Sequence, residues 1–347
     1  EFRATFEMKG KALYPKMDVL FKMMREILTE SKLEDEKRLK EILSMLKSRL
    51  QMSFLSSGHT TAALRALSYS SPLSKFKDDT DGIGYYEAVK EIEEHFEEKK
   101  EELIANLKEL AARIFRADNL MISYTAAPEG LDAVEKEMET FKNGLFERTD
   151  GDEQENRCIL HCVKRNEGFK TSSKVQYVAR TGNFIDGGAA YSGALHILKV
   201  ILSYDYLWQN IRVKGGAYGC MCNFNRIGEG YLISYRDPNL EKTIDVYEKV
   251  TEYLRNFEAD DRDMNKYIIG TISNIDRPMN PSAKGTRSMN LYMNHVTEEM
   301  IRKEREEICA LADVVAAMLA ADQLCVIGSE EKIEEQKALF GEVRTLF

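Results

Sequence analysis

Two side chains with hydrogen-bond donors flank a glycine pair in the second half of the chain. Arg212 and Tyr218 enclose the segment Val-Lys-Gly-Gly-Ala, in which the three small residues are Gly215, Gly216 and Ala217. A glycine pair is costly to order, so it is expected where a helix ends or where another backbone comes close. The two long side chains could then converge on one point. The spacing also fits a capped helix followed by an ordinary hairpin.

The five histidines lack the spacing of a zinc peptidase site. Such a site needs H-E-x-x-H, or its inverse H-x-x-E-H, on one helix face. His95 and Glu98 match the inverse motif, but Lys99 stands where the second histidine is required, and a protonated lysine cannot bind a metal. The Cys-Ile-Leu-His-Cys run at 158–162 has no second, distant pair of ligands. We therefore predict no metal ligand in this chain.

The other histidines and the six cysteines have structural interpretations. His59 is expected near a helix start, and His196 inside an apolar helix as a core residue. His295 has no second ligand one helical turn away. The cysteines are predicted to be reduced and buried, because they form no disulfide framework. The sequence contains no G-x-S-x-G or phosphate-loop motif, so we expect no complete catalytic machinery in this chain.

Composition excludes some classes of partner. The net charge of −9 and the scattered basic residues argue against nucleic acid. The acidic balance fits surface solvation and also a basic substrate. No apolar run approaches the roughly 18 residues of a membrane helix, so we expect no membrane partner. The chain begins at Glu1 without an initiator Met or a signal-like start, and we predict a cytoplasmic fragment of a larger protein.

The elements that position Arg212 and Tyr218 follow from hydrophobic periodicity. Residues 189–211 have the apolar spacing of a helix, which the two glycines end. Residues 217–224 alternate like a strand, and residues 231–235 return as its partner after a turn. Arg212 is thus predicted on the last helical turn, with Tyr218 at the start of the strand.

The chain repeats a pattern of strand, proline turn, two helices and a later short apolar strand. Aligning Pro15 with Pro238 also aligns Lys37 with Asp260. The first copy is predicted at 4–9, 18–29, 37–50 and 120–124, and the second at 231–235, 244–257, 264–275 and 324–328. A repeat of this length indicates duplicated domains rather than a solenoid.

We therefore predict an α+β fold of two related domains, each a mainly antiparallel sheet with helices packed on one face. The first domain is expected at 1–145 and the second, which carries the Arg/Tyr motif, at 158–347. The segment 146–157 between them is rich in Gly, Asp, Glu and Asn and is predicted to be a surface linker.

Further motifs surround the glycine pair and connect the chain to a family. Together they cover most of residues 155–280, and they are Lys174-Val-Gln-Tyr-Val178, Tyr191-Ser-Gly-Ala194, Ser203-Tyr-Asp-Tyr-Leu-Trp208, Arg212-Val-Lys-Gly-Gly-Ala-Tyr218-Gly and Tyr235-Arg-Asp-Pro-Asn239. This set resembles the C-terminal half of the insulinase/pitrilysin zinc peptidases, and within them the presequence protease and falcilysin branch. The first predicted domain fits the preceding domain of that family more loosely.

The resemblance implies a clamshell of four α+β domains, of which this chain would hold the last two. The N-terminal half of such proteins binds the zinc cofactor through H-x-x-E-H, and the C-terminal half closes over an unstructured peptide. Carried over, Arg212 would hold a substrate carbonyl and Tyr218 would donate to the oxyanion. Gly215, Gly216 and Ala217 would let the peptide backbone come close. The missing N-terminal half would be the partner of this chain.

This sequence departs from the family in having no H-x-x-E-H. The departure fits a C-terminal half that is inactive alone, and it fits equally a non-catalytic partner subunit or peptide-binding scaffold of a two-chain protease. A purely structural module is a third interpretation. It predicts that Arg212 and Tyr218 affect folding only.

Overall fold

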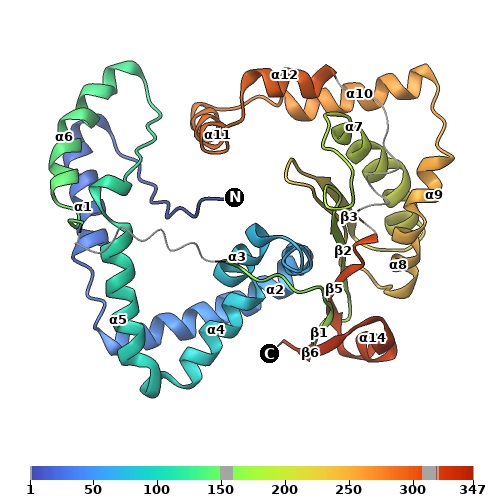
Figure 1. Cartoon of the computed structure of the whole chain (residues 1–347), viewed down its shortest axis with the longest axis horizontal. Coiled ribbons are helices and arrows are strands. Elements are labelled where there is room, and N and C mark those ends of the chain that lie inside the picture. Colours follow the sequence, from blue (N-terminus) through green and yellow to red (C-terminus); the bar gives the residue numbers. More distant parts are fainter. Residues whose placement is uncertain (1, 149–158, 307–317, 319, 347) are drawn as a thin grey trace. The chain divides into compact units, whose positions relative to one another are not determined.

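The computed structural model describes residues 2–148, 159–306, 318 and 320–346, whose helices and strands are drawn in Figure 1. The chain forms two compact units, each assembled from separate stretches of sequence. Unit 1 comprises Glu1–Leu46, Val89–Cys158 and Pro278–Val296, and unit 2 comprises Lys47–Ala88, Ile159–Arg277 and Thr297–Phe347. Most of the predicted linker at 146–157 lies outside the described residues, so the predicted domain boundaries stay a prediction.

Unit 1 is built from helices in its described residues. They are η1 (Tyr14–Lys16), α1 (Met17–Thr29), the first part of α2 (Glu36–Leu67), the later part of α4 (Ile83–Glu94), α5 (Phe96–Ile114), η2 (Ala117–Asn119), η3 (Pro128–Gly130), α6 (Leu131–Asn143) and α11 (Pro281–Met293). The predicted first helix is confirmed by α1. The predicted second helix is confirmed by α2, which runs on beyond residue 50.

The strands predicted at 4–9 and 120–124 are not formed, which corrects the expectation of a sheet in each domain. The described part of unit 1 contains only an isolated bridge, between Arg116 and Phe146. Alternation in the sequence indicates which side chains share a face, but a strand also needs a neighbour for its backbone groups. No described strand supplies that neighbour.

Unit 2 contains one six-stranded sheet in the order β3-β4-β2-β5-β1-β6. Its strands are β1 (Asn166–Thr171), β2 (Tyr177–Asn183), β3 (Gly219–Phe224), β4 (Glu229–Tyr235), β5 (Gln323–Ser329) and β6 (Glu342–Thr345). The pairs β3–β4, β4–β2 and β2–β5 are antiparallel, whereas β5–β1 and β1–β6 are parallel. The α+β class and the strands predicted at 217–224, 231–235 and 324–328 are confirmed.

Helices cover both faces of this sheet, which corrects the expectation that they pack on one face (Figure 1). On one face lie α7 (Ala194–Ile201), η4 (Leu202–Val213), α8 (Glu241–Glu248), α9 (Val250–Arg255) and α14 (Glu330–Glu335). On the other lie the second part of α2, α3 (Pro72–Asp81) and the start of α4. The central strand β5 is buried on both faces, which explains its unbroken run Leu-Cys-Val-Ile.

The remaining elements of unit 2 are α10 (Asp261–Ile275), α12 (Glu298–Glu306) and η5 (Lys337–Leu339). Asp260 caps α10, because its side chain accepts a hydrogen bond from the amide of Asp263 at 2.8 Å. The helices predicted at 244–257 and 264–275 are confirmed by α8, α9 and α10.

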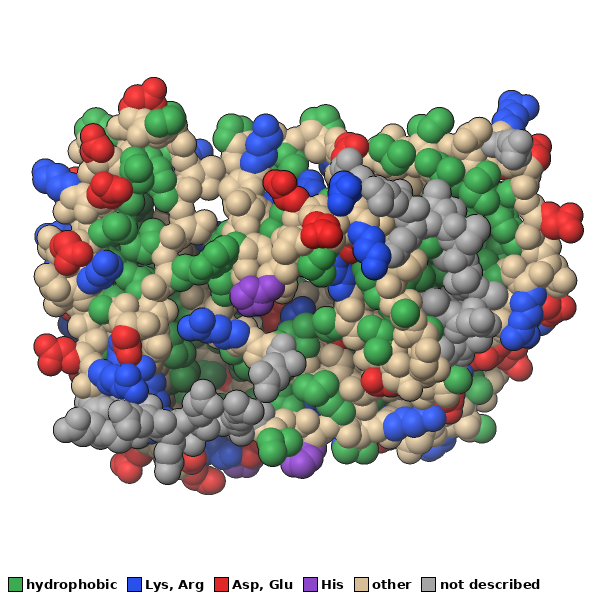
Figure 2. Space-filling view, turned by 45° about the horizontal axis from the view of Figure 1, so that its top comes forward, with side chains coloured by type: hydrophobic (Ala, Val, Ile, Leu, Met, Phe, Trp, Pro, Cys, Tyr) green, Lys and Arg blue, Asp and Glu red, His purple; other side chains and the backbone are tan. Residues whose placement is uncertain are grey.

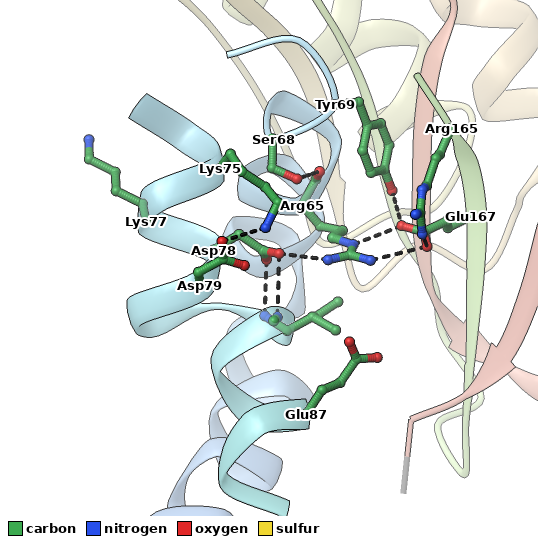
Figure 3. Close-up of polar contacts among 12 residues, drawn as sticks. Arg65, Ser68, Tyr69, Lys75, Lys77, Asp78, Asp79, Glu87, Arg165 and Glu167 are labelled. Atoms are coloured by element: carbon green, nitrogen blue, oxygen red, sulfur yellow. Dashed lines mark hydrogen bonds and ion pairs between the residues drawn. The ribbon is translucent and has the colours of Figure 1, made fainter. Parts of the chain in front are cut away.

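A buried ion-pair cluster joins the second part of α2 to the sheet (Figure 3). The Arg65 guanidinium donates to the Glu167 carboxylate on β1 at 2.7 and 3.1 Å, and to the Asp78 carboxylate at 2.6 Å. The Tyr69 hydroxyl also donates to Glu167, at 2.6 Å. Burial opposes ionisation of Glu167, but the hydrogen bonds and charge of Arg65 outweigh it and hold the pKa of Glu167 below its ordinary value. The cluster therefore fixes these helices on the sheet.

The surface carries charges of both signs. On the face shown in Figure 2, Lys and Arg side chains are interspersed with Asp and Glu side chains rather than gathered in one patch. None of the helices in the described ranges combines the length and apolar character that a bilayer crossing requires.

Candidate functional site

The corner between the helix and β3 is shaped by its glycines. The helix predicted at 189–211 is confirmed as α7 continued by η4, which is a π-helix, a rare form that is frequent at functional sites. Gly216 has a φ of +81°, a left-handed conformation that only glycine adopts without strain. A Cβ atom on Gly215 would lie 2.4 Å from the carbonyl oxygen of Ile211, so this position also has no room for a side chain.

Arg212 lies between two aromatic rings at this corner. Its guanidinium carbon is 4.5 Å from the ring centroid of Trp208 and 5.4 Å from that of Tyr218. Trp208 is four residues before Arg212 and therefore on the same side of the helix. Tyr218 directly precedes β3 and is 65% exposed. The structure thus brings the two predicted site residues together, with Tyr218 exposed and Arg212 half-buried.

The backbone of Tyr218 is held by the end of β4. Its amide donates to the carbonyl oxygens of Tyr235, at 3.0 Å, and Arg236, at 3.3 Å. The two tyrosine rings meet edge to face, with centroids 5.7 Å apart. These contacts fix the backbone of Tyr218 beside Tyr235 and so limit where its side chain can lie.

The turn after β4 is fastened to the glycine corner. The Asn239 side chain donates to the carbonyl oxygen of Gly215 at 2.5 Å, and Pro238 lies against Gly216. Asp237 is fully buried and accepts from the Thr243 hydroxyl at 2.7 Å. Burial raises the pKa of Asp237, even though Thr243 and Asn239 hydrogen-bond to its carboxylate. These contacts give the Asp-Pro-Asn segment a role in positioning that its sequence alone did not reveal.

Tyr235 rests on an aromatic layer supplied by distant parts of the chain. Its ring stacks on Tyr177 at 5.8 Å and meets His59 edge to face at 4.7 Å. His59 follows a break in α2 at Ser57, so its expected place near a helix start is confirmed. Its Nδ1 atom is buried with no hydrogen-bond partner among the described residues, and burial lowers its pKa.

Sequence reasoning identified Arg212 and Tyr218 but missed Trp208, Tyr235 and His59. The family motifs contained the first two of these without a role. His59 lies more than a hundred residues away, and no local pattern connects it to the corner. The signal for Trp208 and Tyr235 was the excess of aromatic residues within the motifs, and only the strand pairing shows what those residues do.

The three small residues between Arg212 and Tyr218 differ in exposure. Gly216 is exposed and Gly215 is half-buried, whereas Ala217 is buried in the core beneath the helix. A bound peptide could therefore reach Gly216 directly but not the side chain of Ala217. The substrate-binding roles of all three stay predictions.

The described residues contain no group of three or more His, Cys, Asp or Glu side chains that could hold a metal ion. Cys158 of the Cys-Ile-Leu-His-Cys run lies outside the described residues. His196 is half-buried rather than a core residue, and its Nε2 lies 3.3 Å from the Tyr191 hydroxyl and 3.8 Å from the Glu304 carboxylate. The four described cysteines, at 162, 220, 222 and 325, are free thiols.

This arrangement can bind and polarise an extended peptide. The Arg212 guanidinium and the exposed Tyr218 ring lie together at the start of β3, which is an edge strand: no described strand pairs with its outer side. Its sequence Gly-Cys-Met-Cys-Asn-Phe contains neither a charge nor a proline, the residues that usually protect an edge from further pairing. Extended peptides add to such edges through main-chain hydrogen bonds.

Comparisons with known proteins match both parts of the chain. The family model described as "PreP C-terminal domain" matches residues 166–319, and the model for the region associated with subfamily C of the M16 peptidases matches residues 1–92. Protein HypA of Clostridium perfringens is 37% identical over 100% of this chain and 36% of its own length. Presequence protease 1, chloroplastic/mitochondrial, of Arabidopsis thaliana is 31% identical over 86% of this chain and 28% of its own length.

The chain thus spans about a third of the length of these relatives. Among solved structures, the peptidase M16 inactive domain from Pseudomonas fluorescens aligns with 89% of this chain and 74% of its own, with a TM-score of 0.51 and 13% identity. That likeness shows a shared fold.

Proposed function

The chain belongs to subfamily C of the peptidase M16 family, and from that premise we propose that it is the C-terminal half of a zinc-dependent oligopeptidase. In this proposal the chain closes over an unstructured peptide and presents Arg212 and Tyr218 to the reacting bond. It is inactive without the N-terminal half of the same protein. We keep the cytoplasmic location as a prediction, since one of the relatives is named as chloroplastic/mitochondrial.

The proposal assigns zinc to the N-terminal half, because the described residues of this chain offer no set of ligands for it. When bound there, zinc supplies an activated water and a positive charge beside the scissile carbonyl. In this proposal the chain itself contributes two hydrogen-bond donors, Arg212 and Tyr218, and a surface on which the peptide lies.

Tyr218 is assigned to the oxyanion that forms when the peptide carbonyl is attacked. An aimed hydroxyl donor of this kind contributes roughly 10²–10³ in rate, because it interacts with charge that exists only in the transition state. Arg212 is assigned to a carbonyl of the substrate, since its guanidinium keeps its proton and carries several fixed donors. The observation that carries the proposal is that the Arg212 guanidinium carbon lies 5.4 Å from the ring centroid of Tyr218, whose side chain is exposed.

The corner itself supports a close approach of the peptide. Gly216 is exposed and has no side chain to hold a backbone away. Next to it, β3 offers an uncharged edge along which an extended peptide can lie. Together these features favour a peptide over a folded partner.

Replacing Tyr218 by phenylalanine in the complete protease tests the assignment. Tyr218→Phe removes one exposed hydroxyl, and we expect kcat to fall by roughly 10²–10³ with KM within about twofold of wild type. Tyr204→Phe is the matched control, because Tyr204 is 62% exposed on η4 and has no assigned role. A normal kcat in Tyr218→Phe would return this tyrosine to a structural role.

Replacing Arg212 by alanine in the complete protease separates the proposal from its alternatives. A non-catalytic partner subunit or peptide-binding scaffold predicts that Arg212→Ala weakens peptide binding while leaving kcat unchanged. A structural module predicts a lower unfolding temperature in Arg212→Ala and no change in the kinetics of the protein that remains folded.

A further inference from the structure

A second arginine borders the tyrosine pair and has no carboxylate partner among the described residues. Five other arginines of unit 2, at 65, 165, 180, 226 and 344, lie within ion-pair distance of carboxylates. Neither Arg212 nor Arg236 forms an ion pair with any described residue. Other exposed arginines, such as Arg255 on α9, also form no ion pair with a described residue, but Arg212 and Arg236 are distinguished by lying against the same pair of tyrosine rings.

Arg236 is held in place by its surroundings. Its guanidinium carbon lies 5.4 Å from the ring centroid of Tyr235. Its backbone has a φ of +48°, a left-handed conformation that is strained for a residue other than glycine. The pairing of Gln176 with Asp237, at 2.8 and 2.9 Å, fixes the chain on the far side of Arg236. An exposed arginine thus occupies a strained position that glycine would fill more easily.

We propose that Arg236 binds a carboxylate of the substrate peptide, next to the carbonyl that Arg212 and Tyr218 hold. The inference rests on the proposed function and adds the chemistry of the substrate to it. A guanidinium that stacks on a ring uses its face, so its in-plane N–H donors remain available for a carboxylate.

The contacts also limit where the carboxylate lies. The rings of Tyr218 and Tyr235 are 5.7 Å apart, and Arg236 lies over the second of them. Since an extended chain advances by roughly 3.3–3.6 Å per residue, the carboxylate belongs within about three residues of the reacting carbonyl. It can be the free C-terminus of a peptide or the side chain of an Asp or Glu.

The experiment compares peptides of one sequence as substrates of the complete protease. The first peptide has a C-terminal amide and a Gln within three residues of the cleaved bond. The second has a free C-terminal carboxylate in the same register. The third keeps the amide but has Glu in place of the Gln. For wild type we expect the KM of at least one acidic peptide to be about fivefold below that of the neutral one, since an exposed charge pair contributes up to about this factor.

Three variants test whether Arg236 causes the preference for an acidic peptide. In Arg236→Gly the backbone keeps its left-handed conformation, and the KM ratio of neutral to acidic peptide should fall to near one. In Arg236→Lys the ratio should be intermediate, because lysine keeps the charge but not the planar fork. Arg255→Gln removes the same charge from an exposed position on α9 and should leave the ratio as in wild type.

The outcomes distinguish this inference from the proposed function. Equal KM values for all peptides in wild type, or the same ratio in wild type and Arg236→Gly, would overturn it, while cleavage that depends on Tyr218 would leave the proposed function standing. If the complete protein cleaves none of the peptides, the proposed function fails and the inference fails with it. A preference for only one acidic peptide identifies the C-terminus or the side chain as the source of the carboxylate.

Discussion

Arg212 lies between the rings of Trp208 and Tyr218, and this position accounts for arginine rather than lysine. The flat guanidinium can stack on an indole and still direct its N–H donors outward, whereas an ammonium group is a compact, strongly hydrated charge. The stacking orders a long side chain before any substrate arrives. Arg212 is therefore prepared for a carbonyl at little further entropic cost.

This stacking can be tested in the chain as it is, because Trp208 is its single tryptophan. Arg212→Ala uncovers one face of the indole, so we expect acrylamide to quench the Trp208 fluorescence more strongly than in wild type. Lys214→Ala is the control, since Lys214 is exposed and contacts Asn210 rather than the ring. Equal quenching in Arg212→Ala and wild type would show that the guanidinium does not cover the indole.

At the scale of single residues, the sequence predicted the two donors but not the side chains that surround them. Arg212 and Tyr218 stand out because donors flank two glycines, a local pattern. The layer of Tyr235, Tyr177 and His59 depends on the register of β2 against β4 and on where α2 crosses the sheet. Arg236 gains significance only from its dihedral angle and from the lack of an ion pair with any described residue.

Elements distant in sequence are fixed to the sheet by the Arg65 cluster. Arg65 on α2 and Asp78 on α3 meet Glu167 on β1, and both carboxylates are fully buried. Removing one partner of such a cluster leaves a buried charge without compensation, which typically costs about 3–5 kcal/mol. The aromatic layer beneath Tyr235 includes His59 of α2, so the cluster also helps to position the candidate site.

The cluster predicts a stability that depends on acid pH. Arg65 holds the pKa of Glu167 below its ordinary value, so the stabilisation is complete above the unfolded pKa of about 4.3 and is lost as the pH falls through the lower folded pKa. We expect Glu167→Gln to have a lower unfolding midpoint than wild type at pH 6, and to lose less on acidification to pH 3. Urea unfolding of wild type and Glu167→Gln at pH 6 and at pH 3 measures these midpoints.

Glu342→Gln is the control for that series, because Glu342 is 48% exposed and lies near Arg165 in the same region. Its midpoints should follow those of wild type. An identical acid loss in wild type and Glu167→Gln would show that Glu167 is not the group that titrates.

The elements themselves were largely predictable where periodicity is strong. The apolar spacing predicted α1, α8, α10 and the helix before the glycines, and it located β3, β4 and β5. It could not supply the neighbours of a strand, which is why residues 4–9 and 120–124 were predicted as strands and are not. It also could not show that residues 47–88 would cover the second face of the sheet, since that contact joins segments about a hundred residues apart.

The molecule as a whole is interpreted as one part of a larger protease. Two stretches of the chain match family models, and the whole chain spans only about a third of the length of its relatives. Arg212 on η4 and Tyr218 just before β3 supply the donors, while the described residues offer no metal site. The central claim is therefore that Arg212 and Tyr218 complete an active site whose zinc lies in the N-terminal half.

Adding this chain to the separately prepared zinc-bearing half tests that claim most directly. The rate of peptide cleavage should rise with the concentration of added chain and then saturate, because the two sets of catalytic groups meet only in the complex. The Arg212→Ala chain should bind as well but saturate at a lower rate. If the zinc-bearing half cleaves peptides equally fast with and without this chain, Arg212 and Tyr218 are not part of the active site.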